Sequence, residues 1–225
     1  MKLNKLLLSL VLATSITVVG CGVKEEPIDN VQKEEQTQNE QVSLSYDTTK
    51  EVLEVKDKNT KVFYPQIKDY PGELLMDYIN QSLKKTADLY ANEDPYTDVK
   101  VDYEITKMDN DILSVLFKGT GKIEGHGEIN IKHSVNIDMK SSNEINYNNL
   151  VKDNDGLMKM LNKKAKEKGL ESVEAEGIRV YFEEENVVFY YMPLDDSAKE
   201  FIELSIPMNE LKGLLNTEFG EIPAS

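Results

Sequence analysis

The side chains with the most distinctive chemistry in this sequence are its two histidines. His133 lies on the apolar side of an alternating segment, which is typical of a hydrogen-bonded core histidine. His126 lies in the glycine-flanked stretch EGHGE, which favours a turn and also leaves the imidazole able to contact a ligand. A zinc site needs three or four converging ligands. The sequence therefore predicts no metal centre, and we expect no cofactor.

The stretch NEDPYTD at 92–98 places three acids and a tyrosine in one loop. Such a loop is typical of a solvated connection after a helix, and it is also able to bind a cation or a basic partner. The candidate ligand-binding residues are Glu93, Asp94, Tyr96, Asp98 and His126.

Other stretches of the sequence do not match the motifs of calcium binding, phosphate binding or glycoside hydrolysis. KDNDGL at 152–157 resembles part of a calcium loop, but Val151 and Asn162 stand where the EF-hand pattern requires acids. We interpret Asp153 to Asp155 as the cap of a helix. The sequence contains no glycine-rich phosphate loop, and no two of its 41 Asp and Glu residues are marked as a glycosidase pair. It predicts no catalytic residues, and we expect a protein that is not an enzyme.

The only cysteine, Cys21, follows two lysines and an apolar run of about a dozen residues. That run is shorter than the about 20 apolar residues of a membrane span, and it matches the apolar part of a secretory signal. Val-Val-Gly-Cys at 18–21 resembles the lipobox of bacterial lipoproteins, whose cysteine receives a diacylglycerol before cleavage. We expect a signal peptide over 1–20 and lipid attachment at Cys21.

Residues 21–44 contain no aromatic side chain and are rich in Glu, Gln, Lys and Asn. Such a segment buries too little apolar surface to offset its ordering entropy, so we expect a disordered tether. Cleavage before Cys21 would leave 24 Lys and Arg against 41 Asp and Glu, a net charge of about −17. This charge argues against nucleic acid as a partner, because phosphates would be repelled.

Residues 45–225 have the patterns of an α+β module, either one unit or two subdomains at about 45–139 and 140–225. Apolar residues recur at helical spacing from Leu75 to Tyr90, and a second helix is expected from about Asp155 to Lys168. A short helix from Asn209 closes the chain. Strands are predicted at 99–106, 112–117, 129–139, 178–182, 187–191 and 202–206.

The alternation at 129–139 predicts a strand with one face in the core and the other facing outward. Together, these elements predict an antiparallel sheet with one helix packed in each half.

Several stretches, in order, resemble one known module: VFYPQI, YINQSL, GHG, VVFYYMP and IELSIPMNELKGLL. The module consists of two consecutive domains of unknown function. It is shared by lysozyme-sensing anti-sigma factors of Gram-positive bacteria and by the N-terminal part of peptidoglycan deacetylases. The matches cover neither an anti-sigma segment nor a deacetylase domain, so neither activity carries over.

The resemblance implies a binding module of the cell envelope, with a lysozyme-type hydrolase or peptidoglycan as its ligand. A strongly acidic domain attracts a basic enzyme over a Debye length of ~8 Å. With acyl chains such as palmitate on Cys21, the protein would be anchored to the extracytoplasmic face of the cell membrane. The alternative is an accessory subunit of a cell-wall-modifying enzyme, or such an enzyme itself, which would need two buried carboxylates in one cleft.

Overall fold

The structure is a computed structural model that describes residues 46–174, 176–195 and 200–219. The predicted signal peptide, Cys21 and the tether up to residue 44 lie outside these ranges and stay predictions. The chain divides into two units between Gln41 and Val42, and the described residues belong to the second. Both of its large apolar clusters are built within that unit. Among the described helices, none is long and apolar enough to cross a membrane.

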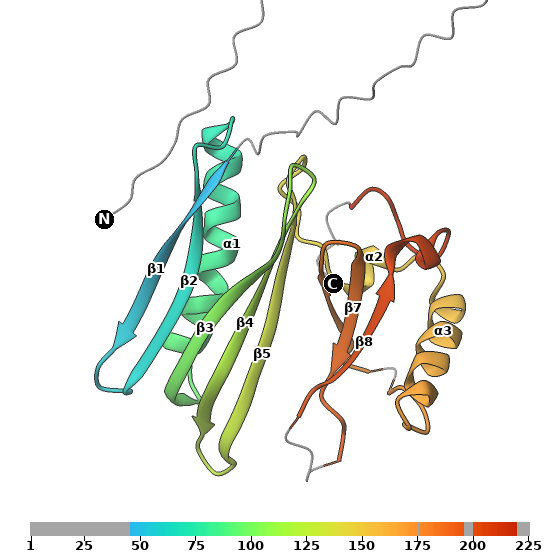
Figure 1. The fold of residues 1–225 in the computed structure, drawn as a ribbon. Helices are drawn as coiled ribbons and strands as arrows, with labels where there is room; N and C mark the ends of the chain where they lie inside the picture. The colour runs from blue at the N-terminus through green and yellow to red at the C-terminus, as the bar shows by residue number, and fades with distance from the viewer. Residues whose placement is uncertain (1–45, 175, 196–199, 220–225) are drawn as a thin grey trace, which may run out of the picture. The chain divides into compact units, whose positions relative to one another are not determined.

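Five strands form the first sheet in the order β1-β2-β3-β4-β5 (Figure 1). They are β1 Asp47–Val55, β2 Thr60–Lys68, β3 Tyr96–Met108, β4 Ile112–Ile123 and β5 Gly127–Asp138. All neighbours are antiparallel except β2 and β3. That pair is parallel because the helix α1 (Glu73–Ala91) connects the two strands, and a helical crossover returns the chain in the same direction. The α+β class is confirmed, whereas the antiparallel expectation does not hold for this pair.

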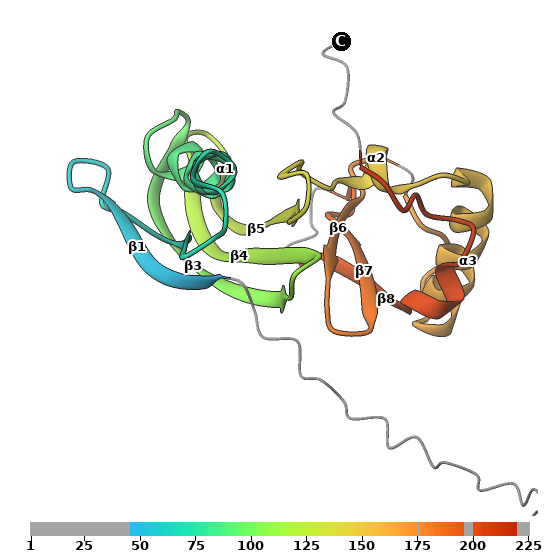
Figure 2. The ribbon, with the colours of Figure 1, turned by 90° about the horizontal axis from the view of Figure 1, so that it is seen from above.

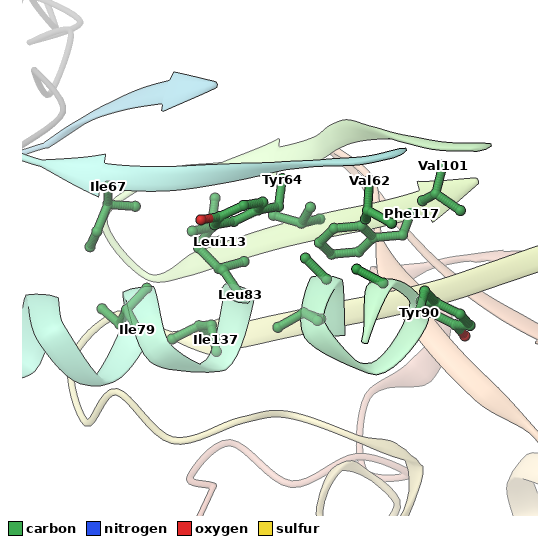
Figure 3. Close-up of a cluster of buried hydrophobic side chains, with 14 of the residues drawn as sticks. Val62, Tyr64, Ile67, Ile79, Leu83, Tyr90, Val101, Leu113, Phe117 and Ile137 are labelled. Carbon is green, nitrogen blue, oxygen red and sulfur yellow. The ribbon is translucent and has the colours of Figure 1, made fainter. Parts of the chain in front are cut away.

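Helix α1 lies along one face of the first sheet (Figure 2). Its buried side chains include Ile79, Leu83 and Tyr90, at the spacing that the sequence predicted. They face the sheet and share one buried cluster with Val62 and Phe117, as Figure 3 shows. This apolar stripe explains why a helix forms here, since most helical stability in proteins comes from packing one face.

Three antiparallel strands form the second sheet, in the order β6-β7-β8. They are β6 Arg179–Phe182, β7 Asn186–Tyr191 and β8 Ile202–Pro207, with helices α2 Tyr147–Leu150 and α3 Asn154–Glu167 and the 3₁₀ helix η1 Met208–Leu211. Asp153 is the N-cap of α3, and its side chain accepts a hydrogen bond from the backbone N–H of Gly156 at 3.0 Å. The predicted cap is therefore confirmed.

The sequence predicts that one face of β5 is directed outward, but β6 covers that face in the structure. Asn136 on β5 is 2% exposed, and Ser114 on the neighbouring strand β4 is 0% exposed. The Asn136 amide donates to the carbonyl of Val180 at 2.8 Å, and the Ser134 hydroxyl donates to the same carbonyl at 2.6 Å. Buried polar groups must be hydrogen-bonded. The polar residues Ser134 and Asn136 of β5 therefore form hydrogen bonds between the two sheets and do not face solvent.

Candidate functional site

Two hollows lie beside β5, the last strand of its sheet, and both are lined by Arg179 at the start of β6. The larger has a volume of about 430 Å³ and the smaller about 200 Å³. Side chains of the larger hollow include Tyr90, Tyr96, Ile129, Lys132, Tyr190 and Phe201. We call the two hollows together the Arg179 cleft.

Arg179 is the only arginine of the 225-residue sequence. Its Nη1 donates to the backbone carbonyl of Lys132 at 3.2 Å, which holds the guanidinium beside β5. No carboxylate among the described residues lies within 4.0 Å of it, although Glu176 lines the same hollow. A guanidinium carries five N–H donors in a planar fork, so this cation retains donors for a ligand.

The other cation of the larger hollow, Lys132, is already neutralised. Its side chain is buried and forms an ion pair with Glu203. Its ammonium also lies 5.1 Å from the ring centre of Tyr190 and 5.3 Å from that of Tyr181, within the range of cation–π attraction. Buried charges need such partners. We therefore infer that Lys132 stabilises the wall of the hollow and does not bind a ligand.

Aromatic rings and neutral hydroxyls form the rest of the wall. Tyr190 packs edge-on against Phe201 at 5.9 Å between ring centres, and Tyr90 against Tyr96 at 5.2 Å. Burial raises the pKa of Tyr90 to about 12, and it also raises the pKa of Tyr190, although the nearby Arg179 cation opposes both shifts. Both phenols therefore keep their protons at neutral pH.

His133 faces the same region and is hydrogen-bonded, as the sequence predicted, although its side chain is half-buried and not fully in the core. Its Nδ1 lies 3.1 Å from the Tyr90 hydroxyl, with which it forms a hydrogen bond. Burial, with a smaller contribution from the Arg179 cation, lowers the pKa of His133 to about 4. The imidazole is therefore neutral at physiological pH.

Acidification from pH 7 to pH 4 is expected to destabilise the domain through His133. An unfolded histidine titrates near 6.5 and this one near 4, so the unfolded state binds more protons between these values. Stability is therefore complete above pH 6.5 and falls as the pH approaches 4, by at most about 3 kcal/mol from this group. Urea unfolding of the wild type and of His133→Gln at several pH values measures the difference. Parallel pH dependences of the two proteins would contradict the assignment.

The candidate residues from the sequence gather at one end of the first sheet, since Tyr96 pairs with Ile123 and Ile123 with Gly127. Tyr96 lines the larger hollow. His126 is exposed in the turn between β4 and β5. Whether these residues bind a ligand stays a prediction.

Two of the acids in the predicted loop have cations beside them. Asp94 lies 3.1 Å from the Lys58 ammonium, and Asp98 lies 2.8 Å from that of Lys122. The Lys122 and Asn59 hydrogen bonds lower the pKa of Asp98. Glu93 is exposed. These pairs reduce the negative field that the loop presents to a basic partner, so the loop is a weaker candidate than its sequence indicated.

Acid–base or metal chemistry finds little support in the described ranges. Partial desolvation raises the pKa of Glu144, which lines the smaller hollow. No three His, Cys, Asp or Glu side chains in these ranges gather closely enough to hold a metal ion. We therefore assign no catalytic pair.

Comparison with known sequences gives no relative for this chain: no protein family model matches it, and no curated protein does.

Comparison with solved structures identifies the fold. A member of the DUF3298 family from Bacteroides fragilis superposes with a TM-score of 0.54 at 12% identity, over 78% of this chain and 94% of that one. A DUF3298 family protein from Pseudomonas aeruginosa gives a TM-score of 0.50 at 11% identity, over 78% and 95%. At this identity the likeness concerns the fold alone. It is consistent with the module of unknown function that the sequence resembles.

Proposed function

We propose that this chain is a binding module of the cell surface, anchored through lipid on Cys21 at the extracytoplasmic face of the membrane. Its ligand in this proposal is peptidoglycan, held in the Arg179 cleft. The observation that carries the proposal is the cleft itself, where Arg179 lies between aromatic side chains and has no carboxylate partner among the residues that the structure describes. Peptidoglycan offers sugar rings and carboxylates, which match aromatic faces and a guanidinium.

A basic lysozyme-type hydrolase is the second candidate ligand, and the net charge of −15 favours it. Charge of this size speeds the encounter with a basic protein, and it adds less to affinity. This candidate therefore differs from the first in a measurable way, because binding by charge attraction weakens as salt rises.

Co-sedimentation with insoluble peptidoglycan tests the first candidate. The unit 42–225 is suitable because its apolar clusters close within it. We expect saturable binding that falls about tenfold in Phe201→Ala, since removing an aromatic wall costs about 1 kcal/mol or more. Phe63→Ala is the matched control, because Phe63 lies on β2 against Lys50 and does not line the cleft. Absence of binding, or equal losses in both variants, would refute the cleft as the peptidoglycan site.

A further inference from the structure

We propose that Arg179 binds a carboxylate of the ligand while the sugar ring that bears it occupies the larger hollow. This inference deepens the proposed function and rests on it, because it names the chemical class that the cleft selects: an acidic sugar in preference to its neutral counterpart.

The charge distribution around the cleft supports a single anionic group. The chain has 41 acids against 26 Lys and Arg, yet no described carboxylate pairs with Arg179. Lys132 is paired with Glu203, so of the described cations that line the larger hollow, Arg179 is the one left for a ligand. Glu176 at the same hollow would repel a dianion more strongly than a monoanion. The site therefore fits a carboxylate better than a phosphate monoester.

The geometry supports a planar group next to a ring. Arginine binds carboxylates through two parallel N–H donors, which an ammonium cannot reproduce. The hydroxyls of Tyr90 and Tyr190 keep their protons and are hydrogen-bonded to His133 and Ser134, so neither adds a negative charge beside the guanidinium. The hollow of about 430 Å³ lies in the size range of small-molecule sites, and Ile129 and Phe201 give it apolar walls for the face of a sugar ring.

Two sugars that differ by one carboxylate distinguish the contribution of the carboxylate from that of the sugar ring. N-acetylmuramic acid and N-acetylglucosamine share one ring, and the first adds a lactyl carboxylate. Both are titrated into residues 42–225 and followed by amide chemical shifts in NMR. We expect the acidic sugar to bind at least about tenfold more tightly, the strength of one charge-assisted contact. Arg179→Gln should reduce this preference to less than about twofold, and Arg179→Lys should keep part of it.

Lys159→Gln is the control, because it removes the same charge from an exposed position on α3 outside the cleft. It should keep the full preference. A preference that survives Arg179→Gln, or equal binding of both sugars by the wild type, would overturn the role of Arg179 while leaving a glycan-binding cleft. Failure of both sugars to bind, together with no sedimentation on peptidoglycan, would overturn the proposed function as well.

Discussion

Asn136→Ala is expected to destabilise the domain by about 3 kcal/mol, a fall of about 9 °C in Tm. Asn136 is 2% exposed and is bonded on both sides of its amide. Its Nδ2 donates to the carbonyls of Ile145 and Val180, and its Oδ1 accepts from Ser114 at 2.7 Å. Alanine would remove the bonds to the Ile145 carbonyl and the Ser114 hydroxyl, and would leave the Val180 carbonyl with the Ser134 hydroxyl as its donor. Thermal unfolding followed by circular dichroism measures the loss.

Asn148→Ala is the matched control, because Asn148 is exposed and its backbone N–H, which donates to Asn146, is kept by alanine. We expect a change below about 0.5 kcal/mol there. Hydrogen exchange adds a local readout: the amide of Phe182, which donates to Ser114 at 3.0 Å, should lose protection in Asn136→Ala. Equal stability of the two variants would show that the contact between the sheets does not depend on this amide.

Cys21→Ser is expected to abolish attachment of fatty acid to the protein. A serine has no thiol to receive a diacylglycerol, and the sequence offers no other cysteine. Two acyl chains at about 0.8 kcal/mol per buried CH₂ hold a protein on a membrane stably, so the change removes the whole anchor. Metabolic labelling of the full chain with an alkyne fatty acid, followed by gel detection, measures the attachment.

The neighbouring substitution Gly22→Ala serves as the control for labelling, since it leaves the thiol in place. It should label as the wild type does. Label that persists in Cys21→Ser would show that the fatty acid is attached to another residue. An unlabelled wild type would contradict the lipid anchor.

Most of the fold follows from apolar periodicity. Helix α1 and strands β3 to β8 were predicted near their observed positions, because each buries a regular apolar face. β1 and β2 were not predicted. β1 is an edge strand with a mostly exposed burial pattern, so its residues show little alternation. The parallel pairing of β2 with β3 depends on how α1 crosses the sheet, which periodicity does not encode.

The cleft was the part that sequence reasoning missed. The alternation of β5 was interpreted as one buried and one solvated face, and nothing in the strand itself indicates that a second sheet covers Ser134 and Asn136. One signal was present in the sequence: a single arginine among 26 basic residues. Its meaning depends on Tyr90, Lys132 and the other residues that the fold brings to it from distant positions.

Calorimetric titration of residues 42–225 with a soluble peptidoglycan fragment and with a basic lysozyme, each at low and high salt, tests the central claim most directly. The proposal predicts one-to-one binding of the fragment that persists at the higher salt and weakens about tenfold in Phe201→Ala. It also predicts that any lysozyme binding weakens strongly as salt rises. Tight, salt-resistant binding of lysozyme with no heat from the fragment would contradict the peptidoglycan cleft and would favour capture of a basic hydrolase.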